Sequence, residues 1–509
     1  MHTMKLRLKM DSSQERVAEK RFRAMWHVHN QLVKHMIHKI NEMRHDKGYK
    51  KLLDGYRAAK DAEDEERRKQ LGKELAAVRE RYGITKAKLE GYAKVMQKNF
   101  SSHLSSQQVQ KEADRVWEGV EKVLFGDGEE LHFKKLDSFR TISSKSMNGC
   151  HYADPLHPSI FKNDEIVYPK GQIIWMGETI KVDVPWDDAY TSFSMDHDIS
   201  YCEIKREPFP NGWHYYVILY LDGPAPAKHL VGKGTSGLDA GVSTMCACSE
   251  SRIQFDELAP GCKGYNKKIA HEQQKIESSK RTLNPDNYNA DGTIKKGKHG
   301  WIISGRCRAH QWREKSLYRQ KAAYVGCSHD VQVNRMLSDS RHFIVEHMDY
   351  QALAKRSKGP AERSGKESAV KKKDGSVVKI HKFKKKRRFG ASVRDRSPGS
   401  FLRKLKERAV RYGGSYEEVD NCTMKASQYD HVTDTCEKVP LGQRYKMVGG
   451  HYVLRDPYSS FLLRWADAER KKPDRGACAA HFDQFLEMQT SMMLDVIGEY
   501  PERPACFGF

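Results

Sequence analysis

The sequence has no Cys-x-x-Cys pair, although eleven cysteines are spread over its 509 residues. It also has no apolar run near the roughly 20 residues that cross a bilayer. The first ten residues alternate basic and apolar side chains and lack the apolar core of a signal peptide. These absences argue against paired-cysteine zinc modules and a membrane span, so we expect a soluble intracellular protein with buried free thiols.

Acidic residues are too few to balance the basic ones. The chain has 67 Asp and Glu against 90 Lys and Arg, which gives a formal net charge of +23. Such an excess indicates a polyanionic partner, and without a membrane segment nucleic acid is favoured. The length predicts two to four domains.

Proline is absent from residues 14–123, where Lys, Arg, Glu and Ala dominate. This composition predicts a helical block with breaks near Gly48 and Gly83, preceded by a strand at Met4–Met10 and an N-cap within residues 11–13. Charge runs of this kind are usually solvated helix faces, but the basic side chains interleave here with Trp26, His27, His29 and Asn30, which leaves room for a nucleic-acid-facing side.

The pattern changes after Gly126. Residues 172–176, 179–184 and 213–220 alternate or run β-branched and aromatic, which predicts an antiparallel sheet or small barrel. If the N-terminal strand joins that sheet, the helical block is an insertion in a β domain. Trp26, Trp117 and Trp213 are expected to pack rather than to stack on bases.

Residues from 234 onward predict strands alternating with long helices. The expected elements are a strand, a bend and a strand over 235–248, helices at Tyr265–Arg281 and Ser304–Leu337, a buried strand at Phe343–Glu346, a helix at Phe401–Tyr412 and a strand at Ser415–Val419.

One segment of this half is strongly basic. Ten of the eighteen residues in Lys371–Arg388 are Lys or Arg, which predicts either a disordered basic lid or a nucleic-acid groove. The candidate contacts within it are Lys371, Lys372, Lys373, Lys384, Lys385, Lys386, Arg387 and Arg388.

Three acidic residues occupy strand or helix ends. Asp239 precedes Ala240 and Gly241 where a strand bends, and Glu346 ends a buried strand. Asp456 precedes Pro457, which suits the first turn of a helix. Carboxylates that meet at strand ends can hold two Mg²⁺ ions for phosphodiester cleavage. Taken singly each has an ordinary structural explanation, so the hypothesis depends on the three together.

Several motifs resemble the TnpB family of transposon-encoded nucleases and the related compact type V CRISPR effectors. They cover most of the chain and fall at Phe133–Lys145, Gly237–Val242, Ile344–Met348, Gly399–Lys406 and Leu454–Leu462. The resemblance implies an RNA-guided DNA endonuclease with one RuvC-type (RNase H-like) site, in which Asp239, Glu346 and Asp456 are both the catalytic residues and the ligands of two Mg²⁺ ions.

The resemblance also implies a multidomain α+β architecture. A helical recognition lobe (13–125) would be inserted in a β-barrel wedge domain (1–12 and 126–232). A RuvC α/β nuclease domain (233–420 and 453–509) would follow, interrupted by a degenerate zinc-ribbon-like segment at 421–452.

The ribbon departs from the family pattern. Relatives carry four cysteines there, whereas this chain has Cys422, His431 and Cys436, with His451 as a possible fourth ligand. A tetrahedral site needs four well-spaced ligands, so we expect no zinc. Near Asp456, Arg444 and Arg455 are candidates to hold a scissile phosphate, although Arg455, as its direct neighbour, is expected to point away.

The implied partners are a guide RNA and target double-stranded DNA flanked by a short motif, in the cytoplasm of a prokaryotic cell in association with the nucleoid. Two alternatives stay open: an RNA-guided DNA-binding repressor without cleavage, and an RNase H-like transposase that uses no RNA. The sequence does not specify the flanking motif, the guide RNA, the number of protein copies per RNA, or whether the gene serves a transposon or a CRISPR array.

Neutralising Lys384, Lys385 and Lys386 to alanine tests the basic run. Each lost phosphate contact should reduce the slope of log affinity against log salt by about 0.7 to 0.9. Nitrocellulose-filter binding at several salt concentrations measures this slope. An unchanged slope would mean that the run is only a solvated segment.

Overall fold

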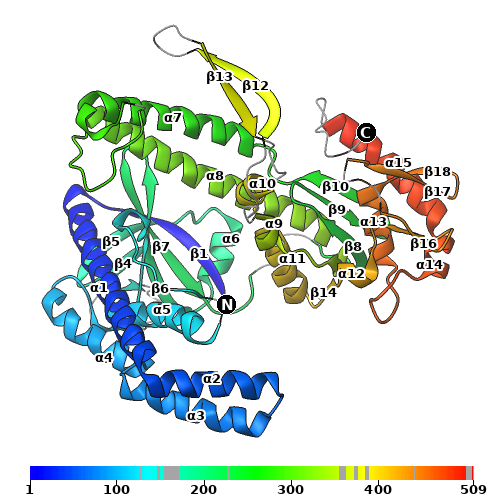
Figure 1. Cartoon of the computed structure of the whole chain (residues 1–509). Coiled ribbons are helices and arrows are strands. Elements are labelled where there is room, and N and C mark those ends of the chain that lie inside the picture. The colour runs from blue at the N-terminus through cyan, green and yellow to red at the C-terminus, as the bar shows by residue number, and fades with distance from the viewer. Residues whose placement is uncertain are drawn as a thin grey trace. The chain divides into compact units, whose positions relative to one another are not determined.

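The computed structural model describes residues 1–126, 128–145, 150–153, 171–225, 230–290, 292–354, 363–371, 377–383, 389–438, 440, 442–499 and 507. The chain divides into two compact units, Met1–Pro226 and Ala227–Phe509. Each unit combines helices with strands (Figure 1), which confirms a multidomain α+β architecture. The finer domain boundaries expected from the sequence remain predictions.

The first unit contains a seven-stranded sheet, and helices α1 to α5 come between its first two strands along the chain (Figure 1). The elements are β1 (His2–Lys9), α1 (Ser12–His45), α2 (Lys47–Asp61), α3 (Glu65–Arg81), α4 (Lys86–Gln97), α5 (Ser106–Phe125), β2 (Thr141–Ser143), β3 (Cys150–Ala153), β4 (Gln172–Trp175), β5 (Glu178–Asp183), α6 (Ala189–Met195), β6 (Ile199–Phe209) and β7 (Gly212–Leu221).

Strand β1 lies in the middle of this sheet, whose order is β2-β6-β7-β1-β5-β4-β3. It pairs antiparallel with β7 on one side and with β5 on the other. Alternate residues Met4, Leu6 and Leu8 are buried, as a half-covered sheet requires. The prediction that the N-terminal strand joins the β region, which makes the helical block an insertion, is therefore confirmed.

Helix α1 begins with the expected cap. The Asp11 carboxylate accepts hydrogen bonds from the backbone N–H groups of Ser13 and Gln14, at 2.7 and 2.8 Å. The first predicted break falls at Asp46 rather than at Gly48, and the second falls at Gly83, which has a left-handed φ of 72°.

The four residues of α1 that interleave with its basic side chains differ in their surroundings. His29 is buried, with its Nδ1 2.6 Å from Glu112 of α5. Trp26 and Asn30 donate to the carbonyl of Lys134 at 2.6 and 2.9 Å. Trp26 and Asn30 are half-buried and His27 is exposed, so only His29 is withdrawn from a possible nucleic-acid-facing side. The expected packing role of Trp26, Trp117 and Trp213 is confirmed, since all three lie against the main core.

The second unit has a five-stranded sheet with long helices. Its elements are β8 (Gly234–Ala240), β9 (Thr244–Cys248), β10 (Ile253–Glu257), α7 (Cys262–Leu283), α8 (Gly305–Leu337), β11 (Ser340–Glu346), α9 (Tyr350–Ala354), β12 (Arg363–Lys371), β13 (Val377–Phe383), α10 (Gly390–Arg396), α11 (Pro398–Arg411), β14 (Ser415–Val419), α12 (Asn421–Met424), β15 (Tyr429–Asp430), β16 (Thr435–Cys436), β17 (Tyr445–Val448), β18 (His451–Leu454), α13 (Arg455–Arg464), α14 (Arg475–Ala480) and α15 (Phe482–Glu499).

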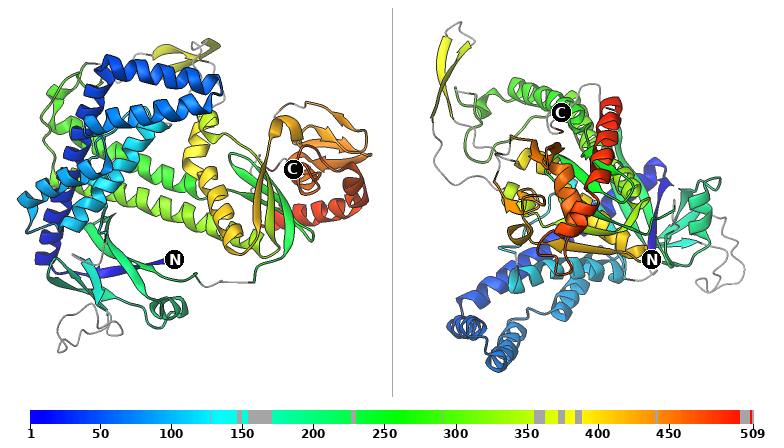
Figure 2. Two further views of the ribbon diagram at one scale, coloured as in Figure 1. Left: turned by 90° about the horizontal axis from the view of Figure 1, so that it is seen from below. Right: turned by 90° about the vertical axis from the view of Figure 1, so that its right-hand side faces the viewer.

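The order of this sheet is β10-β9-β8-β11-β14. Strands β8, β11 and β14 are parallel to one another, and β9 runs antiparallel to both of its neighbours. The two crossovers are made by α7 with α8, which run side by side in both figures, and by α9 to α11 (Figures 1 and 2). The predicted helices and the strand Ser415–Val419 are confirmed.

Each face of the sheet is covered by its own helices. On one face, Leu238, Phe343 and Val345 pack with α8 and α11. On the other, Cys246, Cys248 and Ile344 pack with α13 and α15. Because successive strand residues point to opposite faces, these two cores decide where every side chain of the central strands lies.

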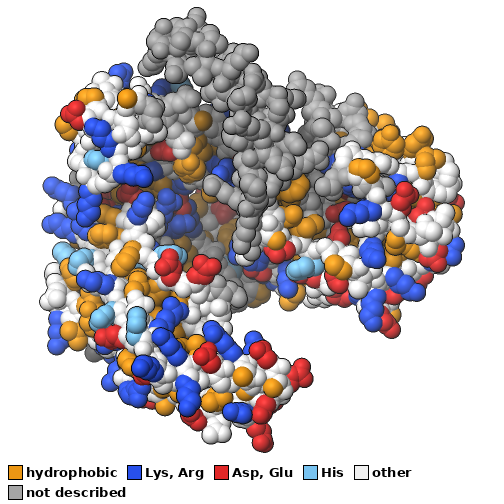
Figure 3. Space-filling view, viewed as in Figure 1, with side chains coloured by type: hydrophobic (Ala, Val, Ile, Leu, Met, Phe, Trp, Pro, Cys, Tyr) orange, Lys and Arg blue, Asp and Glu red, His pale blue; other side chains and the backbone are white. Residues whose placement is uncertain are grey.

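Of the nine cysteines whose side chains the structure describes, six are buried free thiols, whereas Cys327, Cys422 and Cys436 are exposed. Among the described helices, none is both long and apolar enough to cross a membrane. Lys and Arg side chains are spread over much of the face shown in Figure 3.

Replacing Gly237 with alanine should destabilise the second unit. A Cβ at residue 237 would collide with the backbone of Ser460 and Arg464 in α13, where backbone cannot swing aside. Overpacking of this kind costs about 1–3 kcal/mol or more. Scanning calorimetry of the full chain should show a lower midpoint for this unit.

Gly264→Ala is the matched control, because a Cβ there meets open space on α7. It should leave the midpoint unchanged or slightly raised. Equal midpoints for the two variants would show that α13 is not packed on β8 as described.

Candidate active site

Asp239 stands next to last in β8 and is half-buried. Its neighbours Leu238 and Ala240 face the α8 core, so Asp239 faces α13. Its backbone N–H donates to the Ser460 hydroxyl of α13 at 3.3 Å. Strand β8 therefore holds this carboxylate against the helix that follows β18.

Glu346 is the last residue of β11, the parallel neighbour of β8. The register pairs Val345 with Leu238, so one residue further along both strands come Glu346 and Asp239. The carboxyl ends of adjacent parallel strands are a common place for a functional site in α/β sheets.

Asp456 lies in the first turn of α13. Pro457 follows it and is buried, as are Tyr458, Phe461 and Leu462 of the apolar stripe that anchors the helix. The Ser460 hydroxyl lies 2.8 Å from the Cys246 carbonyl and 2.9 Å from that of Asp456. This hydroxyl ties the start of α13 to the β8–β9 pair and thereby places Asp456 beside the strand ends.

The three carboxylates repel one another. Burial raises the pKa of Asp239 well above its ordinary value, and the negative charges of Asp456 and Glu346 raise it further. The pKa of Glu346 is also raised, by burial first and then by Asp456. The structure thus brings the three predicted acids into one electrostatic group.

Two arginines contact Asp456. Arg455 lies with Nε and Nη2 each 3.2 Å from Oδ1, and Arg444 places Nη1 3.6 Å from Oδ2. The backbone N–H of Arg455 donates to the Arg444 carbonyl at 2.8 Å, which fixes the two arginines together. The prediction that Arg455 points away is wrong, because its guanidinium folds back onto the neighbouring carboxylate.

In the part of the chain that the structure describes, no group of three or more His, Cys, Asp or Glu side chains is arranged so that it could hold a metal ion. At the acidic group the donors are the hard oxygens that Mg²⁺ prefers, but Asp456 is directed to arginines. In the ribbon-like segment, the His431 Nδ1 lies 2.6 Å from the Tyr458 hydroxyl, whereas Cys422 and Cys436 are exposed.

Most of the basic residues predicted to bind nucleic acid lie outside the described residues. These are Lys372, Lys373, Lys384, Lys385, Lys386, Arg387 and Arg388, while Lys371 is described only as the end of β12. Arg444, the remaining candidate, is half-buried beside Asp456.

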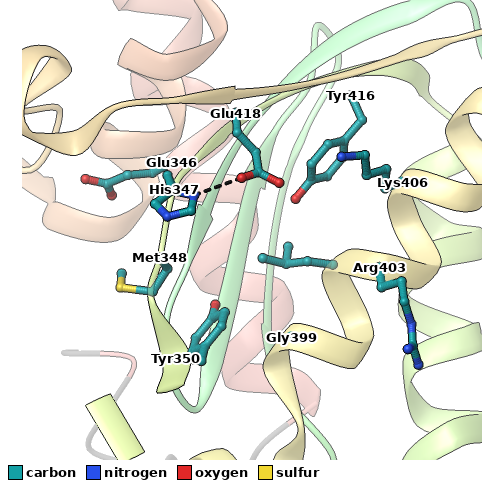
Figure 4. Close-up of a pocket in the computed structure, with 10 residues that line it drawn as sticks. Glu346, His347, Met348, Tyr350, Gly399, Arg403, Lys406, Tyr416 and Glu418 are labelled. Carbon is teal, nitrogen blue, oxygen red and sulfur yellow. Dashed lines mark hydrogen bonds and ion pairs between the residues drawn. The ribbon is translucent and has the colours of Figure 1, made fainter. Parts of the chain in front are cut away.

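The sequence did not single out the residues that bring the acids together. Gly237 and Ser460 do so, one by having no side chain and the other by its hydroxyl. Gly237 could have been identified from the sequence, because it lies two positions before Asp239 and therefore on the same face of β8. A cavity beside Glu346, lined by Tyr350, Tyr416 and side chains of α11, was not expected either (Figure 4).

Comparison with known proteins gives little further support. No protein-family model and no curated protein matches the sequence. Among solved structures, a chain described as a "Cryo-EM structure of CRISPR-Cas12f Ternary Complex" aligns over 90% of this chain and 98% of its own length, at 11% identity. The TM-score is 0.24, which does not establish a common fold.

Replacing Asp239 with asparagine should stabilise the metal-free protein. The raised pKa means that folded Asp239 holds its proton more tightly than the unfolded chain, so ionised Asp239 costs stability as the pH rises through that pKa. The Asn variant escapes this loss, and its advantage in unfolding midpoint should grow from acid toward neutral pH.

Scanning fluorimetry in EDTA across this pH range measures the effect. Glu487→Gln removes a charge from an exposed position on α15 and should show no such trend. A destabilised Asp239→Asn at neutral pH would mean that the three carboxylates do not repel one another.

Proposed function

We propose that this protein is an RNA-guided DNA endonuclease of the TnpB and compact type V kind, with a single RuvC-type active site formed by Asp239, Glu346 and Asp456. The observation that carries the proposal is the convergence of three acids from the ends of β8 and β11 and the first turn of α13, placed by the β8–β11 register and by the Ser460 hydroxyl. Like charges are costly to gather, and structures tolerate them chiefly where a cation or a reaction needs them.

In this proposal the β10-β9-β8-β11-β14 sheet with its helices is the RNase H-like nuclease domain. The seven-stranded sheet of the first unit is the wedge domain, and α1 to α5 are the recognition lobe inserted in it. The net charge of +23 supports a protein that holds both an RNA and a DNA duplex.

The three carboxylates would hold Mg²⁺, which when bound supplies Lewis-acid activation of water and of the leaving oxygen. The residues of the chain have the positioning role. Ser460 and Gly237 fix the spacing of α13 from β8, and Arg444 and Arg455 balance the charge of Asp456. For Asp456 to act as a ligand, at least one oxygen must leave its arginine.

One observation favours a second candidate, an RNA-guided repressor that binds DNA without cutting it. If the two arginines stay paired with Asp456, the third ligand is never released, and the acidic group cannot close on metal. The same contact suits a nuclease as a resting arrangement, in which a bound cation would compete with the two arginines for the oxygens of Asp456.

Cleavage by the purified complex tests the proposal. The full chain is isolated with its bound RNA, the RNA is sequenced, and duplex DNA matching its guide portion is supplied in Mg²⁺ or EDTA. We expect cutting in Mg²⁺ only. Asp239→Ala should reduce the cleavage rate by more than about 100-fold. Even the loss of a residue that only hydrogen-bonds a metal ligand lowers metal affinity or activity by about 10–100-fold. Target binding should stay near wild type.

Glu487→Ala is the control, because it removes an exposed carboxylate from the second turn of α15, outside the acidic group. Tight, specific binding without any cutting by the wild type would replace the nuclease with the repressor. Cutting that needs no RNA would favour the transposase alternative. Loss of binding in Asp239→Ala would make Asp239 a structural residue.

A further inference from the structure

A cavity of about 280 Å³ opens where β11 and β14 end against α11. Its wall includes Glu346, Met348, Tyr350, Leu402, Lys406 and Tyr416. Figure 4 shows Glu346, His347 and Met348 on one side, and Arg403, Lys406 and Tyr416 on the other. A water molecule takes about 30 Å³, so the space holds roughly nine waters and is large enough for an organic ring.

The chemistry of the wall changes across the cavity. Leu402, Met348 and the rings of Tyr350 and Tyr416 give it an apolar floor. The Tyr350 hydroxyl donates to the Ala240 carbonyl at 3.0 Å, directly after Asp239 in β8, so this ring is held rigidly. Tyr416 is half-buried in β14 and packs against the core under α11. Fixed aromatic walls of this kind suit a planar heterocycle.

The rim carries two cations, Lys406 and Arg403, on the α11 side, across from the carboxylates of Glu346 and Glu418. His347 and Glu418 pair with each other at 2.8 Å. Lys406 makes no ion pair among the described residues, and its ammonium lies 5.3 Å from the centre of the Tyr416 ring. Arg403 is largely exposed and reaches Glu407 only at 4.0 Å. Glu346 belongs to the acidic group.

We propose that this cavity is the subsite for one nucleotide of the DNA strand being cut, beside the scissile phosphate, with the base against Tyr350 and Tyr416 and the backbone phosphate at Lys406 and Arg403. The inference rests on the proposed nuclease function, because Glu346 is shared by the cavity and the acidic group. Aromatic rings next to exposed cations are the arrangement that binds single-stranded nucleic acid without reading its sequence.

A fluorescent base analogue tests the subsite directly. The complex of Asp239→Asn protein with its bound RNA is given matched DNA that carries 2-aminopurine at successive positions around the cut site. Quenching by an aromatic wall should appear at one position next to the scissile phosphate. It should be lost in Gly399→Leu, because a Cβ at residue 399 already contacts Tyr350 at 3.7 Å and a longer side chain fills the cavity.

Kinetics on the cleaving protein give the second readout. Tyr416→Leu keeps apolar packing but removes the ring, and the KM for DNA should rise roughly tenfold with a smaller change in kcat. Lys406→Ala should lower the salt slope of binding by about 0.7, the value for one single-strand phosphate. Arg411→Ala removes an equally exposed charge from the end of α11, outside the cavity, and should change neither quantity.

The outcomes separate the subsite from the nuclease. Cutting by the wild type with unchanged KM and quenching in Gly399→Leu and Tyr416→Leu overturns the subsite and leaves the nuclease. Quenching at one position without any cutting supports the subsite in a protein that only binds. Quenching confined to analogues placed in the RNA would assign the cavity to the guide and overturn the proposal.

Discussion

Helix α13 lies directly on strand β8 because residue 237 has no side chain. At that point the backbone of Ser460 and Arg464 occupies the space that any Cβ would need. The close approach sets the height of the first turn of α13 above the sheet, and Asp456 is in that turn. The distance of Asp456 from Asp239 and Glu346 therefore depends on the absence of a side chain at Gly237 and not on attraction between charges.

Attraction could not have gathered these groups. Asp239, Glu346 and Asp456 repel one another, and burial makes the repulsion stronger because the surrounding medium screens less. The energy that holds them must come from the apolar contacts of Tyr458, Phe461 and Leu462 beneath α13. Arg444 and Arg455 relieve the repulsion at Asp456, and the charge of Arg455 also partly offsets the raised pKa of Asp239. The pKa of Glu346 is raised by burial and by Asp456.

The sequence predicted the elements that carry the three acids, since each depends on local patterns. A strand followed by a glycine-assisted bend predicted β8 and β9, a short apolar run predicted β11, and Pro457 predicted the start of α13. The sequence did not predict where polar side chains find distant partners. Trp26 and Asn30 bind the Lys134 carbonyl across the fold, and Arg455 turns back onto Asp456. The first two contacts join residues that are far apart in the sequence, so no local pattern predicts them. The third depends on the side-chain rotamer of Arg455, which the spacing of residues does not determine.

The cavity was beyond prediction for a related reason. Its wall is drawn from the ends of β11, α9, α11 and β14, and none of these segments is unusual by itself. Tyr416 and Glu418 pair in register with Phe343 and Val345, which places them on the α11 face of the sheet, whereas Asp239 faces α13. Glu346 is the last residue of β11, and the strand ends where the two faces meet. Because Glu346 lies at this strand end, its carboxylate can belong to the acidic group on the α13 face and also border the cavity on the α11 face. A nucleic-acid strand that reached the acids would thus be expected to pass over this edge.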